Sequence, residues 1–183
     1  MRFVYWSIAA LLTAIACHAA FILIVPAYSL DRTIARIERG SGPNRFFILT
    51  EDEQQRLSPG YPRHSVTGVC AFDVSQSNVT LAANVPEGFW TLTIYSSRGD
   101  VIYSANNAQT GTNSFTVSLS LAPDLIEMLK QATAKEPVDA DTGWTVSSPA
   151  PNGLAVLWYP VAEPAQRTGI IREMSKTVCQ PSA

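Results

Sequence analysis

The chain has 183 residues, of which 13 are lysine or arginine and 15 are aspartate or glutamate, so its formal net charge is -2. This is the length of one domain, and the basic residues are scattered from Arg2 to Lys176. No nucleic-acid partner is expected, because such proteins gather positive charge on one face. The three cysteines form no C-x-x-C pair and there are two histidines, so neither a metal site nor a cofactor is predicted.

The first segment is apolar and carries no formal charge from Phe3 to Pro26. As a helix of about 24 residues it would measure about 36 Å, which exceeds a hydrocarbon core of about 30 Å. Tyr5, Trp6 and Tyr28 lie at its two ends, where aromatic residues meet the membrane interface. We therefore predict a retained transmembrane signal-anchor over residues 1–28.

Other interpretations of this segment stay open. The small residues from Ala14 to Ala20 are a candidate signal-peptidase site, although the apolar run continues to Val25, past any such site. Cys17 is a candidate for lipid attachment, but the residues after it stay apolar instead of forming a polar tether. His18 is interpreted as a neutral imidazole at a helix contact, with a functional intramembrane group as the alternative.

Two features of the sequence favour opposite orientations of the domain that follows the membrane span. Four arginines follow the span closely, namely Arg32, Arg36, Arg39 and Arg45. Their excess favours a cytoplasmic domain by the positive-inside rule. Cys70 and Cys179 favour export, because disulfides persist in the periplasm and are rare in the cytosol. We follow the cysteines and predict a single-pass membrane protein whose domain is exported.

A juxtamembrane amphipathic helix is predicted over residues 29–41. Leu30, Ile34 and Ile37 recur at helical spacing, with Ser29 as the N-cap and Gly40 as the terminating residue. Residues 51–64, which are rich in charge and contain two prolines, are predicted to form an exposed loop.

Short strands bounded by turn residues fill most of the remaining domain, residues 42–183. They are predicted over 46–49, 66–74, 79–83, 89–95, 101–105, 115–121, 144–147 and 154–159. This spacing is typical of an antiparallel β-sandwich, here jelly-roll-like. Two helices are predicted to begin at Pro123 and Pro164, which makes the fold class α+β.

Several motifs of the domain carry a resemblance to a known family. They are FWTLTIY at 89–95, followed by Arg98-Gly99 and YSAN at 103–106; GPNRF at 42–46; VCAFD at 69–73; and TVCQP at 177–181. The chain resembles the short membrane-anchored alphaproteobacterial members of domain-of-unknown-function family twelve fifty-four, with its partner family twelve fourteen. The resemblance covers most of the chain, implies a bacterial envelope protein of unknown activity, and supplies no catalytic residues. Combined with the export that the cysteines favour, it implies a single-pass protein of the bacterial inner membrane with a periplasmic domain.

Four aromatic residues are the candidate ligand-binding residues, because pockets are commonly lined by such side chains: Trp90, Tyr95, Tyr103 and Trp158. The alternative is that they are core and interface aromatics of the sheets.

Three further motifs are interpreted as structural. Arg98-Gly99-Asp100 between two strands is typical of a hairpin turn. Asp139-x-Asp141-x-Gly143 lacks the further carboxylates of a calcium loop. His64 has no G-x-S-x-G elbow or positioned carboxylate to make it a catalytic base.

Cys70 in an apolar strand and Cys179 after the last helix are predicted to form a disulfide that fastens the chain end to the sheet. The alternative is two unrelated buried thiols. With no catalytic constellation visible, we predict a non-enzymatic binding or interaction module with a possible envelope protein partner. The alternatives are a membrane-anchored enzyme with an unrecognised pocket and a structural subunit whose small residues, such as Ala16 and Ala20, pack against other membrane helices.

Overall fold

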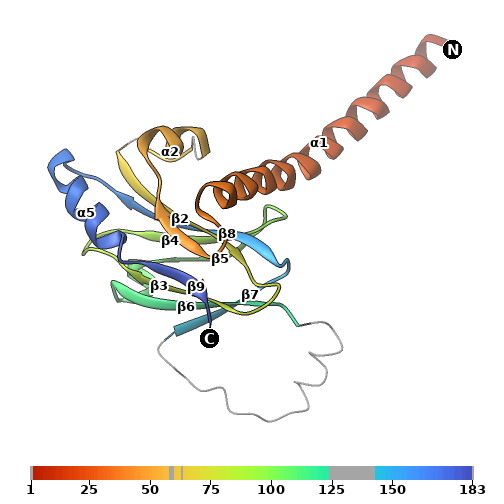
Figure 1. Cartoon of the computed structure of the whole chain (residues 1–183). Coiled ribbons are helices and arrows are strands. Elements are labelled where there is room, and N and C mark those ends of the chain that lie inside the picture. Colours follow the sequence, from red (N-terminus) through yellow and green to blue (C-terminus); the bar gives the residue numbers. More distant parts are fainter. Residues whose placement is uncertain (1, 58–59, 63, 124–142, 183) are drawn as a thin grey trace.

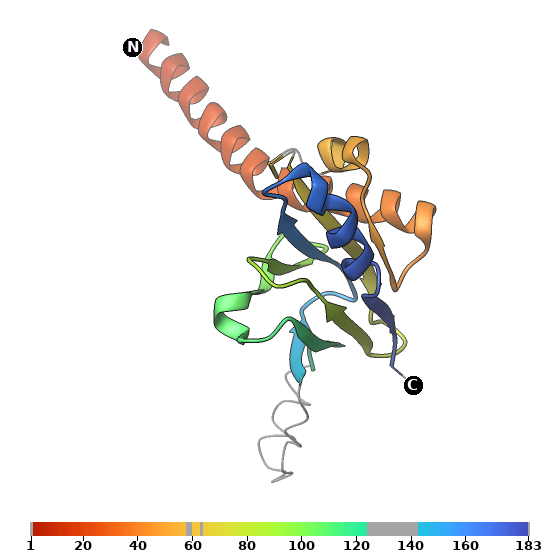
Figure 2. The same ribbon diagram turned by 90° about the vertical axis from the view of Figure 1, so that its left-hand side faces the viewer.

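The computed structural model describes residues 2–57, 60–62, 64–123 and 143–182. It begins with one long helix, α1 (Arg2–Ser41), whose N-terminal part extends away from two β-sheets (Figures 1 and 2). Within the described residues, α1 is the one helix long and apolar enough to cross a membrane. Large apolar side chains along its first part, such as Phe3, Leu12 and Phe21, lie exposed.

The backbone of α1 is helical from end to end, so residues 29–41 are helical as predicted, but they continue the first helix instead of forming a separate one capped by Ser29. Proline removes one hydrogen bond from a helix, yet α1 continues through Pro26. The helix ends at Ser41, and the residue that terminates it is Gly42 rather than Gly40. Gly42 has φ of 82°, and its N–H donates to the Glu38 carbonyl at 2.8 Å, a C-terminal arrangement that glycine favours.

Five strands form the first sheet, in the order β1-β2-β8-β4-β5, and all neighbours are antiparallel. They are β1 (Arg45–Ile48), β2 (Ser65–Asp73), β8 (Asn152–Pro160), β4 (Thr91–Ser96) and β5 (Val101–Asn106). All five were predicted, with differences of one or two residues at their ends. The turn at Arg98-Gly99-Asp100 joins β4 to β5, and Gly99 has φ of 94°.

Four strands form the second sheet, in the order β7-β6-β3-β9. They are β7 (Gly143–Ser148), β6 (Ser114–Leu121), β3 (Val79–Asn84) and β9 (Val178–Pro181). The expectation of purely antiparallel pairing is wrong for one pair, because β6 and β7 run parallel. A parallel pair needs a crossover of a dozen or more residues, and residues 122–142 link these two strands. Strand β9, which pairs with β3, was not predicted.

Short helices complete the described fold: α2 (Glu51–Leu57), α3 (Asn107–Thr110), the 3-10 turn η1 (Pro164–Gln166) and α5 (Arg167–Met174). The helix predicted from Pro164 is confirmed, whereas the helix predicted from Pro123 and the Asp139 to Asp141 motif lie outside the described residues. The predicted loop over 51–64 is wrong at its start, where α2 forms. Thr50 and Glu53 make a reciprocal cap: the Glu53 N–H donates to the Thr50 hydroxyl and the Thr50 N–H donates to the Glu53 carboxylate.

Side chains of both sheets meet in one buried cluster, which includes Phe72, Leu81, Trp90 and Leu119. A second cluster lies on the other face of the first sheet, where Ile34 and Ile37 of α1 pack against Val69, Leu154 and Val156. Strand β2 is therefore covered on both faces, which explains its nearly continuous apolar sequence. The fold is α+β, with two sheets and an apolar N-terminal helix.

The predicted disulfide is confirmed. Cys70 and Cys179 are bonded, and their Cα atoms are 6.5 Å apart. Cys70 belongs to β2 of the first sheet and Cys179 to β9 of the second, so the bond joins the two sheets directly. Cys17 is a free, exposed thiol on α1.

Candidate functional site

The structure divides the four candidate aromatic residues between the two faces of the first sheet. Trp90 is completely buried in the cluster between the sheets, where its ring stacks on Phe115 with centroids 4.6 Å apart. Tyr103 lies on the same side, 6.4 Å from Trp144 between ring centroids, and burial raises the pKa of its phenol. These two residues belong to the core.

Tyr95 and Trp158 lie on the opposite, outer face of the first sheet. Trp158 contacts Tyr61 and Phe89, with ring centroids 6.1 and 6.2 Å away. Burial raises the pKa of Tyr61 to about 12, and the neighbouring Tyr95 adds to this shift. The structure therefore brings Tyr95 and Trp158 to the same face but does not assemble all four residues around one pocket.

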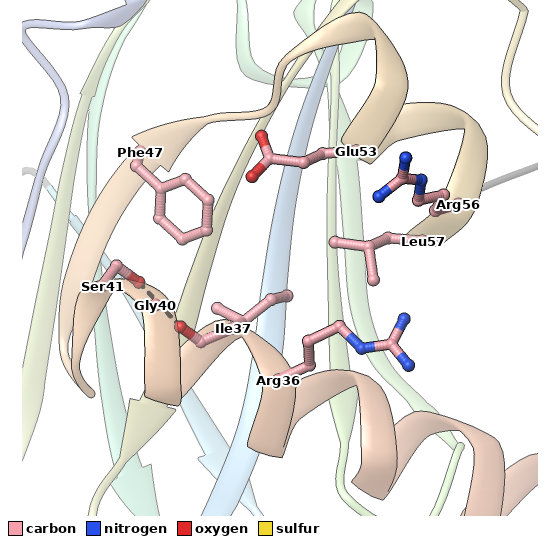
Figure 3. Close-up of a pocket in the computed structure, with 8 residues that line it drawn as sticks. All are labelled: Arg36, Ile37, Gly40, Ser41, Phe47, Glu53, Arg56 and Leu57. Atoms are coloured by element: carbon pink, nitrogen blue, oxygen red, sulfur yellow. Dashed lines mark hydrogen bonds between the residues drawn. The ribbon is translucent and has the colours of Figure 1, made fainter.

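Two cavities lie on this outer face, beside the last turns of α1. The first has a volume of about 460 Å³ and is lined by Ser29, Leu30, Thr33, Leu57, Gly60, Tyr61, Tyr95, Leu154 and Val156. The second has a volume of about 500 Å³ and is lined by Arg36, Ile37, Gly40, Ser41, Phe47, Glu53, Arg56 and Leu57 (Figure 3). Both volumes fall within the range of small-molecule sites.

The two cavities are neighbours along a single face of α1. Ser29, Thr33, Arg36 and Gly40 are spaced by four, three and four residues, which places them in one row on a helix. Leu57 of α2 lines both cavities, so it lies between them. We call the two cavities together the α1 groove. Its walls are α1 and α2, and its floor is the outer face of the first sheet.

Helix α2 is held in place by polar contacts, of which those of Gln54 are buried or half-buried. The Gln54 amide nitrogen donates to the Pro62 carbonyl at 3.0 Å and to the Ser65 hydroxyl at 2.7 Å. Arg167 of α5 donates to the Ser65 carbonyl at 2.9 Å and pairs with Glu51 at 3.3 Å. These contacts fix the wall of the groove that carries Arg56 and Leu57.

Two exposed arginines line the second cavity. Arg36 and Arg56 are exposed, and neither forms an ion pair or hydrogen bond with another described residue. Glu53 also lines this cavity, but its carboxylate accepts hydrogen bonds from the Thr50 N–H at 2.9 Å and the Thr50 hydroxyl at 2.8 Å. Hydrogen bonds from the Thr50 backbone N–H and hydroxyl, and the nearby charge of Arg56, lower the pKa of Glu53, so its carboxylate stays anionic. With two arginines and one carboxylate, the described side chains that line this cavity carry a net positive charge.

Sequence reasoning missed the α1 groove, because its residues come from α1, α2, three strands of the first sheet and the segment after α2. Arg36 was considered only as one of the arginines that bear on the orientation of the membrane span. Arg56 lay in the predicted loop over 51–64. The Thr50 to Glu53 capping box was the local signal that could have revealed α2. Within the described ranges, no group of three or more His, Cys, Asp or Glu residues could hold a metal ion. His64 is exposed just before β2 and does not line the groove.

Comparison with known proteins relates the chain by fold only. No family model and no curated protein matches it. Solved structures that resemble it include the crystal structure of the VPA0106 protein from Vibrio parahaemolyticus, with a TM-score of 0.60 and 11% identity. That likeness covers 87% of this chain and 36% of the Vibrio protein, so this chain spans about a third of that protein's length.

A second structure, of an uncharacterised protein from Burkholderia cenocepacia, has a TM-score of 0.45 and 10% identity, and covers 66% of this chain and 32% of that one. The fold and the groove together define a class: an α+β protein with two sheets and a long apolar helix that flanks a cavity. The Vibrio protein therefore shares this fold over about a third of its own length.

Proposed function

We propose that the chain is a membrane-anchored binding module of the bacterial cell envelope, without catalytic activity. Its apolar helix is retained as one inner-membrane span, and the two sheets, which share a core, form a jelly-roll-like sandwich in the periplasm. One observation carries this proposal. Helix α1 runs unbroken from its apolar part to the turns that flank the α1 groove, so the helix that anchors the domain also lines both cavities of the groove.

The Cys70–Cys179 disulfide supports export, because disulfides form and persist in oxidising compartments. The motifs at 42–46, 69–73, 89–95 and 177–181 support membership of domain-of-unknown-function family twelve fifty-four, which we also propose. The α1 groove supports binding over catalysis: the serine, threonine and tyrosine hydroxyls that line it have no described lining histidine, cysteine or lysine beside them, and its one described carboxylate, Glu53, accepts hydrogen bonds from Thr50.

A pair of reporter fusions tests the topology. With the domain in the periplasm, alkaline phosphatase fused after Ala183 is active in cells and green fluorescent protein fused there is dark. The opposite result contradicts the periplasmic placement. Intact mass of the mature protein tests the anchor: a species that begins near Ala19 or Ala20, or one with lipid on Cys17, contradicts retention of the span.

Two experiments separate binding from the alternatives. Hydrolysis of any member of an ester, peptide or glycan panel by the purified chain would favour an enzyme. Replacement of Phe3 to Val25 by an unrelated apolar span separates a binding module from a structural subunit. A binding module keeps its crosslinked partners in native membranes after this exchange, whereas a subunit that docks through its membrane helix loses them.

A further inference from the structure

We propose that the α1 groove holds one anionic single-chain lipid of the fatty-acid class, taken from the bilayer. Its acidic head lies between Arg36 and Arg56, and its acyl chain follows α1 toward the membrane. This inference deepens the proposed function and rests on the membrane anchorage stated there. It depends on three properties of the groove: its position, its apolar walls and its charge.

The position of the groove places one of its ends at the membrane surface. Ser29 follows Val25, the last residue of the apolar run, by about 6 Å along a helix axis. The polar layer of a bilayer is about 5 to 8 Å thick on each side. The cavity lined by Ser29 and Leu30 therefore lies at the height of the lipid head groups, and the groove rises from there to Arg36, about 16 Å beyond Val25.

The walls between these two ends suit an acyl chain. Leu30, Leu57 and Val156 line the cavity near the membrane, and Ile37 and Phe47 line the cavity farther away. A methylene chain gains free energy by moving from water onto such side chains. The row on α1 contributes only small or flexible side chains to the groove, and Gly40 contributes none, which leaves room along the helix.

The charge at the far end suits an anion. Figure 3 shows the guanidinium groups of Arg36 and Arg56 on the same open side of the cavity, with Leu57 between them. Guanidinium groups bind carboxylate and phosphate through paired hydrogen bonds, and neither of these two forms a hydrogen bond or close ion pair with a described residue, although the charge of Arg56 acts on Glu53. An acidic head group can pair with both guanidinium groups, whereas a neutral head group lacks the charge to do so.

Binding is tested with oleate on the purified full chain in a maltoside detergent, by native mass spectrometry and by crosslinking with a photoactivatable oleate. One oleate per chain is expected, crosslinked to the segment that contains Leu57. Oleyl alcohol is expected to bind much more weakly, and excess inorganic phosphate is expected not to displace oleate. Equal binding of oleyl alcohol, or displacement by phosphate, would overturn the proposal in favour of a plain apolar surface or a free-anion site.

Substitutions at the groove have matched controls elsewhere in the chain. A Cβ at Gly40 meets nothing within 4 Å, so Gly40→Leu preserves the helix and fills the second cavity. Gly169 in α5 is equally open and lies outside the groove, so Gly169→Leu is its control. Gly40→Leu is expected to abolish oleate binding, and Gly169→Leu to leave it unchanged. Equal effects of the two would contradict binding in the groove.

The charge requirement is tested by Arg36→Gln combined with Arg56→Gln. This pair is expected to weaken oleate binding about tenfold or more, because a hydrogen bond to a charged group contributes about that much to affinity. Arg39→Gln is the control, since Arg39 is exposed on the same helix and donates to the Ala35 carbonyl. Failure to bind oleate while the reporter fusions still place the domain in the periplasm would reject the lipid and leave the proposed function standing. The reverse reporter result would reject the function itself.

Discussion

At some glycines, neighbouring strands and aromatic rings leave no space for a side chain. Gly153 is the residue after Asn152, with which β8 begins. A Cβ at this position would collide with the Phe72 ring and the Tyr95 carbonyl oxygen. We expect Gly153→Ala to destabilise the chain by about 1 to 3 kcal/mol, the usual cost of overpacking. Thermal unfolding of the detergent-solubilised chain, followed by circular dichroism, measures this change.

The control for Gly153 is Gly169→Ala in α5, where a Cβ meets nothing within 4 Å. Alanine there is expected to stabilise the helix by about 0.5 to 1 kcal/mol. A Gly153→Ala chain as stable as the parent would mean that β8 and β4 can separate to admit a methyl group, contrary to the described packing.

Glu38 on α1 makes stability depend on pH in an unusual direction. Burial raises the pKa of its carboxyl above 4.5, the nearby Asp73 adds to the shift, and a hydrogen bond with Asn152 partly offsets it. The folded chain therefore holds this proton more tightly than the unfolded chain does. The stability that Glu38 contributes is present in acid and is lost as pH rises through 4.5 to the raised pKa.

We expect Glu38→Gln to remove this loss, so that the variant is at least as stable as the parent at neutral pH. Melting temperatures of both chains, measured from about pH 4.5 to neutrality, give the comparison. Parallel curves for the two chains would contradict a raised pKa at Glu38.

Among the secondary-structure elements, α2 depends most clearly on a local signal. Thr50 and Glu53 satisfy backbone N–H groups at its start, and the helix carries two groove residues, Arg56 and Leu57. We expect Thr50→Ala to destabilise the chain by about 1 kcal/mol, the typical cost of a lost N-cap. Thr168→Ala is the control, because Thr168 lies exposed in α5. Chemical unfolding of both variants measures the difference, and equal stabilities would mean that tertiary contacts alone hold α2.

Elements with a local pattern were predictable, and elements defined by distant partners were not. Strands such as β3 and β6 alternate apolar and polar residues, so their ranges follow from the sequence. Strand β9 has four residues and exists because it pairs with β3, a contact that no local pattern indicates. The parallel pairing of β6 and β7 is hidden for the same reason.

The site was predictable only in part. Trp90 and Tyr95 are separated by five positions, and an odd separation along an extended chain places side chains on opposite faces. Their separation by the sheet was therefore foreseeable, although the sequence analysis grouped them. The α1 groove was not foreseeable, because Arg36 and Arg56 come together only after α1 packs on the outer face of the first sheet.

At the scale of the whole molecule, the two sheets approach each other at both edges, where β1 lies beside β9 and β5 beside β7. The Cys70–Cys179 bond adds a covalent link between the sheets across a sequence separation of 109 residues. Both cysteines are buried, so the bond lies inside the shared core rather than on the surface. It therefore ties the end of the chain to the sheet that carries the α1 groove.

We expect Cys70→Ser combined with Cys179→Ser to lower the free energy of unfolding by about 4 to 5 kcal/mol, the chain-entropy value for a loop of roughly this length. A strong reductant should lower the melting temperature of the parent toward that of this variant and leave the variant unchanged, because the bond is already absent there. Cys17→Ser is the control: its thiol is free and exposed, so its melting temperature should match that of the parent with and without reductant. A parent that melts at the same temperature in reductant, after mass spectrometry has verified reduction of the bond, would show that the sheets are held by their core alone. In that case the disulfide would report the compartment in which the chain folds but would not explain its stability.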